Sequence, residues 1–241
     1  VPVSSLGVTN EPEMHTRRHL LSFALCLGAC TVMPIQLEDP VLELRIYQLK
    51  PEHRDNLITL FESKFIESQE MLGARIVGTF RVPEQPDRFV WLRTFASMQS
   101  RAVSLQAFYT SDTWRANSRA ANETMISVDD VYLLRSTGKR LNLPSNRPSL
   151  GVTRDSPTAI SVELFPLSAV AEVELCVRSD PTVLATYVTE ESPNNFPALP
   201  VREDRVVVVM RRDITGSSRL LCGAPSLRLL RLAPTARSLL R

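Results

Sequence analysis

The order of strand-like and helix-like segments from residue 41 onward limits this chain to few folds. Residues 41–49 (VLELRIYQL) alternate apolar and polar side chains, which is typical of a strand with two different faces. Residues 51–71 begin with proline and place apolar side chains near helical spacing, which favours a helix. The sequence therefore predicts a strand that leads directly into a helix.

Two further strands are predicted at residues 74–82 and 89–95. The turn between them contains Pro83 and Pro86, and we expect these prolines to stop the strand pairing because proline has no backbone N–H to donate. These segments therefore predict a hairpin after the first helix.

The next segment, residues 96–123, has a mainly helical pattern with a break near Ser111, and residues 131–135 read as a short closing strand. The resulting order is β-α-β-β-α-β, with the helices on one face of the sheet. This order indicates a ferredoxin-like α+β unit at residues 41–136.

A weaker copy of the same order follows a linker at residues 137–157, which is rich in Pro, Ser, Asn and Gly. Within residues 158–241 we expect a strand at 158–165, a short helix at 168–177, and strands at 183–189, 205–210 and 227–232. Few residues separate the last two strands, so the second large helix must be short or missing. The chain is thus predicted to hold tandem ferredoxin-like (βαββαβ) repeats, the second of them shortened.

The N-terminal stretch RRHLLSFALCLGAC, residues 17–30, has two arginines before a short apolar run. As a helix, the run would reach only ~16 Å, against ~30 Å of bilayer hydrocarbon, so it cannot span a membrane. A charged start, a short apolar middle and a small-residue end are typical of a secretory signal.

The end of this stretch, Leu27-Gly28-Ala29-Cys30, resembles the lipobox of bacterial lipoproteins, and residues 16–21 resemble a twin-arginine export signal. We expect residues 1–13 to be an upstream extension, 14–29 a signal peptide and 30–40 a tether, with lipidation at Cys30. This predicts an exported periplasmic or cell-envelope lipoprotein of a bacterium. An ordinary N-terminal helix and cleavage without lipidation stay open.

The charge pattern and the cysteines exclude some classes of function. The net charge is only +2, and arginines are scattered among acids, so we expect no nucleic-acid partner. Cys176 and Cys222 have no CxxC spacing for zinc or redox chemistry, and both a disulfide and two free thiols stay open. We expect no metal site.

Five segments of the chain resemble the NIPSNAP family. They are ELRIYQLKP at 43–51, FVWLRTF at 89–95 with Arg101 following, DTW at 112–114, TEESPNNFPALPVRE at 189–203 and LAPTARS at 232–238. The last two look like the two-repeat bacterial members. The resemblance covers residues 41–241 and implies a dimeric α/β-barrel fold, in which two ferredoxin-like sheets pack face to face. It implies no established activity, and a homodimer stays open.

Alternation along the first strand suggests a ligand site. If its apolar side chains pack under the helices, Glu43, Arg45 and Tyr47 point into the barrel beside Trp91 and Arg93 of the third strand. Arginines hold carboxylates or phosphates and aromatic rings supply flat apolar walls, so this set suits a small anionic or aromatic ligand. The alternative is a structural network in which Glu43 neutralises an arginine.

The proline-rich loop of the second half is the other candidate site. Asn194, Asn195 and Phe196 lie between two prolines, and Arg202 follows them. Such a loop is suited to a rigid cover over a barrel end, and Phe196 could plug the barrel or meet a partner.

An enzyme has less support in the sequence. Some proteins with this barrel fold degrade haem or oxygenate small molecules, but His53 is the one histidine outside the signal and lies at a polar helix start. No catalytic triad, glycine-rich phosphate loop or cofactor is indicated. We expect an exported, lipid-anchored ligand-binding or interaction module. The alternatives are a cofactor-free or haem-linked oxygenase-like enzyme using the same cavity, and a degenerate second repeat with little function beyond folding.

Overall fold

The computed structural model describes residues 40–241 apart from 153–155, 157, 214–219 and 221. The signal-like stretch and Cys30 lie outside the described residues. The first half contains β1 (Val41–Leu49), α1 (Arg54–Leu60), a π-helical turn (Phe61–Phe65), α2 (Ile66–Glu70), β2 (Arg75–Val82), β3 (Gln85–Phe95), α3 (Met98–Tyr109), α4 (Asp112–Asn122) and β4 (Met125–Ser136). The second half contains β5 (Ala159–Pro166), a 3-10 turn (Leu167–Ala169), α5 (Val170–Val177), β6 (Val183–Thr189), β7 (Val206–Asp213) and β8 (Arg228–Pro234).

The predicted order of elements is confirmed along the described residues, and several strand ends differ, two of them by four residues or more. β4 is longer than the predicted strand at 131–135, and β3 begins at Gln85, so the turn after Val82 is shorter than expected. Pro86 is accommodated because it lies in a register shift between the pairs Arg81–Phe89 and Val82–Gln85, where no ladder hydrogen bond is required of it.

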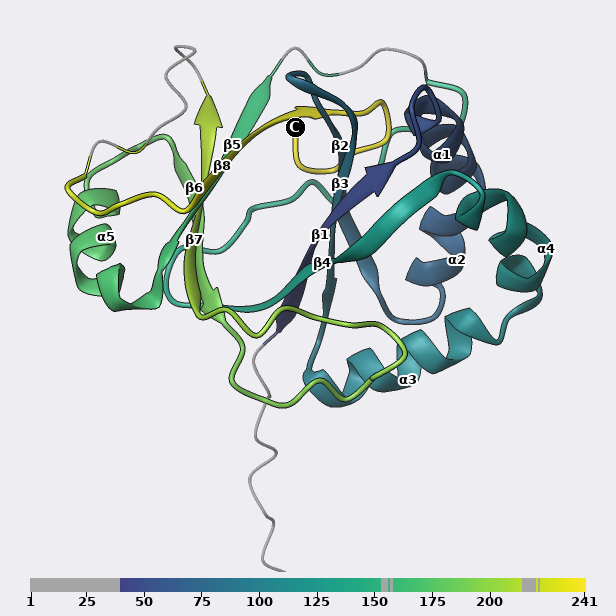
Figure 1. Cartoon of the computed structure of the whole chain (residues 1–241), viewed down its shortest axis with the longest axis horizontal. Coiled ribbons are helices and arrows are strands. Elements are labelled where there is room, and N and C mark those ends of the chain that lie inside the picture. Colours follow the sequence, from purple (N-terminus) through teal and green to yellow (C-terminus); the bar gives the residue numbers. More distant parts are fainter. Residues whose placement is uncertain (1–39, 153–155, 157, 214–219, 221) are drawn as a thin grey trace, which may run out of the picture. The chain divides into compact units, whose positions relative to one another are not determined.

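The strands close into a barrel in the order β1-β3-β2-β8-β5-β7-β6-β4 (Figure 1). Within the first half the order is β4-β1-β3-β2, and within the second half it is β8-β5-β7-β6, so corresponding strands occupy corresponding places. The halves join at β2–β8 and β4–β6, where only short stretches pair. The described chain is therefore an α+β protein built on one antiparallel barrel.

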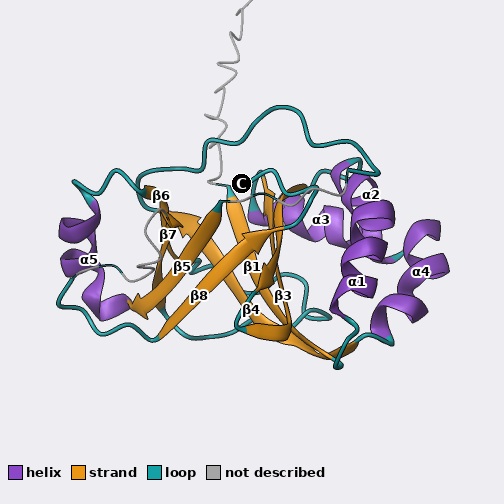
Figure 2. Ribbon diagram, turned by 90° about the horizontal axis from the view of Figure 1, so that it is seen from above, coloured by secondary structure: helices purple, strands orange, loops and turns teal. Residues whose placement is uncertain are grey.

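Helices cover the barrel from two opposite sides (Figure 2). α1 to α4 pack outside the strands of the first half, and α5 packs outside those of the second. Between β7 and β8 the described residues form no helix, and residues 214–219 and 221 lie outside the described part, so the shortening of the second repeat stays a prediction. Among the elements that the structure places, no helix is long and apolar enough to cross a membrane.

The barrel interior is an apolar core to which all eight strands contribute. Leu42, Leu44 and Ile46 of β1 point into it and are at most 3% exposed. The expectation that these side chains pack under the helices was therefore wrong: the polar face of β1 turns outward to the helices. Both faces of β1 are buried, so its alternation alone does not distinguish the two orientations.

Residues 141–147 of the predicted linker and the C-terminal tail after β8 pack against the barrel. Leu141 and Leu143 contact the interior core. Arg147 donates hydrogen bonds to the Arg237 carbonyl at 2.7 Å and to the Glu70 carboxylate at 2.6 Å. The tail motif LAPTARS is thus buried structure.

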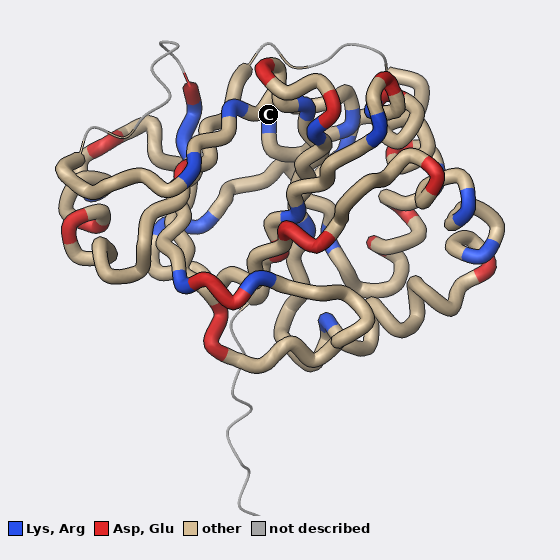
Figure 3. Tube along the Cα trace, in the orientation of Figure 1, with Lys and Arg blue, Asp and Glu red and all other residues tan. Residues whose placement is uncertain are grey.

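Basic and acidic positions are interleaved along the described trace (Figure 3).

Candidate functional site

A buried carboxylate lies between the first-half strands and the helices that cover them. Glu43 Oε2 accepts hydrogen bonds from Arg93 Nε at 2.7 Å and from Arg45 Nη1 at 2.9 Å, and Oε1 accepts one from Arg101 Nε at 2.6 Å. All four residues are 0% exposed. The structure thus places three guanidinium groups around one carboxylate in a layer closed to solvent.

Local structure explains why these side chains meet. Glu43 and Arg45 are two residues apart on β1 and share a face, and Arg93 is the partner of Glu43 in the β1–β3 register. Arg101 arrives from α3, whose start is fixed by a capping box between Ser97 and Ser100.

The guanidinium groups of Arg45 and Arg93 also form hydrogen bonds and ring contacts outside the ion-pair cluster. Arg45 Nε donates to the Tyr47 hydroxyl at 3.0 Å, and Arg93 Nη1 donates to Gln69 Oε1 at 2.7 Å. The Trp91 ring lies between two of the guanidiniums, 5.3 Å from Arg45 Cζ and 4.9 Å from Arg93 Cζ. The five residues expected at one site are therefore together, but outside the barrel instead of inside it.

The electrostatics of the cluster leave excess positive charge. Burial by itself raises the pKa of Glu43, but the charges of Arg93, Arg45 and Arg101 reverse this and hold that pKa well below its usual range. One ionised carboxylate therefore faces three guanidiniums. Trp91 Nε1, Arg93 Nη2 and Arg101 Nη2 are buried and have no hydrogen-bond partner among the described residues. Unpaired buried N–H groups are costly, so an additional acceptor would be favoured here.

An aromatic cavity of about 120 Å³ adjoins this cluster. Its aromatic lining consists of Tyr47, Phe61, Phe65, Trp91, Phe108, Tyr109 and Trp114. The rings pack edge to face, with centroids 4.8 Å apart for both Phe61–Trp91 and Tyr109–Trp114. Burial raises the pKa of Tyr109, so its hydroxyl stays neutral and can donate a hydrogen bond.

The loop between β6 and β7 closes the site from the second half. Arg101 Nη1 donates to Asn194 Oδ1 at 3.1 Å and to Asn195 Oδ1 at 2.8 Å. Phe196 stacks on Tyr109 at 5.9 Å, and Leu199 lines the cavity. The expectation that Phe196 could plug the barrel was wrong, because its ring packs on the helix layer outside the barrel.

Arg202, the fourth loop residue expected at a site, lies apart from this cavity. Its side chain is 40% exposed and forms an ion pair with Asp204. It also lies over the Tyr132 ring at 5.6 Å. We therefore leave it out of the site.

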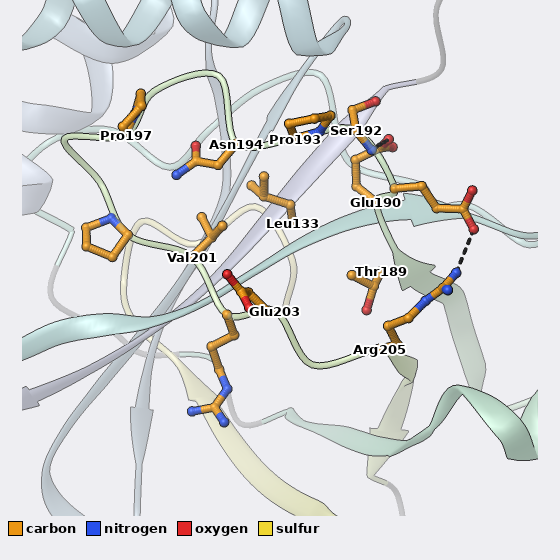
Figure 4. A pocket seen from close by; sticks show the side chains of 13 residues that line it. Leu133, Thr189, Glu190, Ser192, Pro193, Asn194, Pro197, Val201, Glu203 and Arg205 are labelled. Atoms are coloured by element: carbon orange, nitrogen blue, oxygen red, sulfur yellow. Dashed lines mark hydrogen bonds and ion pairs between the residues drawn. The ribbon is translucent and has the colours of Figure 1, made fainter.

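The same loop borders an open hollow of about 810 Å³ (Figure 4). Figure 4 shows Pro193 and Asn194 on one side of it and Arg205 on the other, with Leu133 between them. The ion pair of Arg205 with Glu191, 2.8 Å long, is more than 60% exposed on both sides. Such solvated charges bind ligands weakly, so the aromatic cavity, whose ring walls are mostly buried, is the stronger candidate.

Metal and haem ligands are not gathered here. His53 precedes α1 and is not among the residues that line the cavity. Within the described part of the chain, no three His, Cys, Asp or Glu side chains are grouped to hold a metal ion.

Sequence reasoning missed several members of the site. Arg101 was quoted in the family resemblance but not assigned to a site, and Gln69, Tyr109 and Leu199 were not singled out. Gln69 gave a weak signal, because it is four residues after Phe65 and so places a polar side chain on the apolar face of the predicted helix. The others come together only through the packing of α3 and of the distant loop.

Comparisons with known proteins agree with this description. The NIPSNAP family model matches residues 42–137. A proposed monooxygenase from Lactobacillus acidophilus NCFM is 9% identical, covers 84% of this chain and 97% of its own, and has a TM-score of 0.51, which shows a shared fold across both halves.

Two NIPSNAP structures each cover less than half of this chain. An uncharacterised NIPSNAP-like domain protein from Burkholderia xenovorans is 21% identical and covers 44% of this chain and 93% of its own, with a TM-score of 0.40. A NIPSNAP family protein from Agrobacterium tumefaciens is 19% identical, with coverages of 41% and 93% and a TM-score of 0.38. No curated protein matches the chain. The family match covers Glu43, Arg45, Arg93 and Arg101 of the buried cluster, and residues 42–137 are therefore similar to the NIPSNAP family.

Proposed function

We propose that this protein binds a small aromatic acid in the cavity between the first-half strands and helices α1–α4. The observation that carries the proposal is an aromatic cavity whose lining residues Tyr47, Gln69 and Trp91 contact two of the three buried guanidiniums that share a single carboxylate. Aromatic walls favour a planar ring, and an anionic oxygen on that ring would offset the excess positive charge.

The size of the cavity limits the ligand. An engineered cavity of ~150 Å³ in another protein holds benzene, so about 120 Å³ suits one small ring. Nucleotides and porphyrins are far larger. The haem-linked version of the enzyme hypothesis is therefore not supported by this cavity, whose described lining also contains no histidine.

Tryptophan fluorescence offers a direct test, because both tryptophans of the chain line the cavity. Titration with benzoate should change the emission in a saturable way. Benzamide has nearly the same shape without the charge and should bind at least about tenfold more weakly, since it forms no charge-assisted hydrogen bonds. Equal affinities for the two compounds would refute the acidic part of the proposal.

A pair of matched variants locates the binding. Val128→Phe fills the cavity, which Val128 lines, and should abolish the benzoate response. Val103→Phe makes the same change at a position that is 61% exposed, and should leave it unchanged. Benzoate binding that survives Val128→Phe would place the ligand elsewhere.

A cofactor-free oxygenase acting on such a ligand is the second candidate. The mostly buried aromatic walls of the cavity favour it, because reactive intermediates survive longer where less water reaches them. Oxygen consumption on addition of small dihydroxyaromatic acids would support this activity, and a ligand recovered unchanged would leave simple binding.

Export and membrane anchoring belong to the same proposal and are supported by the sequence pattern at residues 14–30. Intact mass spectrometry of chain expressed from Met14 in a bacterial host should give a species that begins at an acylated Cys30. A Cys30→Ala chain should lack the acyl mass. A chain that keeps residues 14–29 and carries no acyl group would exclude lipidation.

We further propose that the two halves are copies of one βαββαβ unit. Their identical strand order supports this, as do Glu43 of β1 and Glu163 of β5, which both face outward from the centre of the corresponding strand. Because both halves lie in one chain, the barrel closes without a second molecule.

A further inference from the structure

The outer face of the second half has a thin cover. α5 contributes the buried Val173, and residues 220–224 contribute Leu220 and Ala224. These side chains pack with Phe165, Val207 and Val209 of β5 and β7. In the first half, four helices cover the corresponding side of the sheet.

Backbone hydrogen bonds help to hold Leu220 and the loop segment at residues 222–224. The Leu220 N–H donates to Glu163 Oε2 at 2.6 Å, and the Cys222 N–H donates to the Leu220 carbonyl at 3.0 Å. Gly223 lies against α5, because a Cβ atom added to it would be only 2.5 Å from Glu172 Oε1. The segment and the helix are therefore in close contact at this point.

The contact brings two thiols together. Cys176 is four residues after Glu172 and lies on the same face of α5. Cys176 and Cys222 are both partly buried against the same apolar cluster, and Cys222 directly precedes Gly223, which lies against that face of α5. Burial, the Cys222 thiol and Glu172 together raise the pKa of Cys176, so neutral pH favours its thiol over the reactive thiolate.

We propose that Cys176 and Cys222 form a reversible disulfide that fastens residues 222–224 to α5. The oxidant is a small disulfide such as oxidised glutathione. One cysteine thiolate attacks a glutathione sulfur and releases one reduced glutathione, and the other cysteine thiolate then attacks the mixed disulfide and releases the second. The two cysteines lose two protons and two electrons, and the oxidised glutathione gains them.

The disulfide would add stability to the second half, whose sheet is covered by few of the described elements on its outer face. A disulfide between these positions closes a loop that contains β6 and β7, and such a constraint lowers the entropy of the unfolded chain. The inference is independent of the proposed ligand site, which lies on the opposite side of the barrel.

The test uses full-length chain carrying Cys26→Ser and Cys30→Ser, so that Cys176 and Cys222 are the remaining thiols. After treatment with oxidised glutathione and N-ethylmaleimide, the intact mass should show the loss of two hydrogens, no maleimide and no glutathione. The oxidised monomer should have a Tm roughly 5–15 °C above the reduced one. Adding Cys222→Ser should remove the Tm difference and leave one blocked thiol.

Three outcomes would overturn the proposal. Two maleimide groups after oxidation would show that the thiols do not pair, and covalent dimers would show that they pair between chains. An unchanged or lowered Tm would show that the bond does not fasten the segment. The comparison of oxidised with reduced protein needs no cysteine variant at 176 or 222, so it holds even if those variants fold poorly.

Discussion

Replacing Glu43 with glutamine tests whether the buried cluster depends on that carboxylate. In the folded protein Glu43 accepts hydrogen bonds from three guanidiniums, and none of the four residues is exposed. Glu43→Gln keeps the shape but removes the negative charge. Removal of one partner from a buried ion pair typically costs ~3–5 kcal/mol, because the remaining charge stays buried without compensation.

This cost is large compared with the ~5–15 kcal/mol that stabilises a typical domain, so the variant should fold but be much weaker. With a urea m-value of ~2–3 kcal/mol/M, the unfolding midpoint should fall by roughly 1–2 M. The Tm should fall by roughly 6–20 °C. Urea unfolding followed by circular dichroism and tryptophan fluorescence measures both the midpoint and the slope.

Glu123→Gln is the matched control, because Glu123 forms an exposed ion pair with Arg119 on α4. It should leave the midpoint unchanged within error. If Glu43→Gln lowers the free energy of unfolding by less than ~1 kcal/mol, another group must neutralise the arginines. The argument that the cluster carries excess positive charge then fails. If the cluster also binds ligand, benzoate should recover part of the lost stability.

Three further predictions follow from the geometry. Folding lowers the pKa of Glu43, so the stability that its ionised carboxylate contributes is complete above about pH 5 and is lost as the pH falls below ~4. The urea midpoint of the wild type should therefore fall more steeply from pH 5 to pH 3 than that of Glu43→Gln. Gly78→Ala should lower the free energy of unfolding in urea by ~1–3 kcal/mol, because the new Cβ would lie 2.4 Å from Phe80 Cζ. Gly138→Ala is the control and should cost little, because the nearest atom to its new Cβ is 3.6 Å away. Equal effects of the two changes would contradict this prediction. Asn195→Ala removes an acceptor from Arg101 and a donor to a backbone carbonyl, so stopped-flow fluorescence should show benzoate leaving up to about tenfold faster, and an unchanged rate would exclude the loop as a cover.

The sequence determined the order of strands and helices, because period-2 and helical patterns are local properties of the chain. Residues 41–49 and 183–189 were bounded correctly from their alternation and flanking residues alone. Strand ends such as Gln85 were less predictable, because pairing through a register shift can carry a strand past a proline.

The sequence also indicated that Glu43, Arg45, Tyr47, Trp91 and Arg93 belong together, since alternate residues of paired strands share a face. It did not determine which face. β1 has the barrel core on one side and the helix layer on the other, so both of its faces are buried and hydrophobic alternation is consistent with either orientation.

Tertiary structure decided that question by supplying partners for the charged face. Arg101 and Gln69 come from helices, and Asn194 and Asn195 come from a loop nearly a hundred residues further along the chain. A buried guanidinium is tolerated where acceptors surround it, and Gln69, Asn194 and Asn195 provide such acceptors on the helix side of the sheet, whereas the described core of the barrel interior is mainly apolar. The local pattern therefore fixed the elements, and the satisfaction of buried charge by distant residues fixed the site.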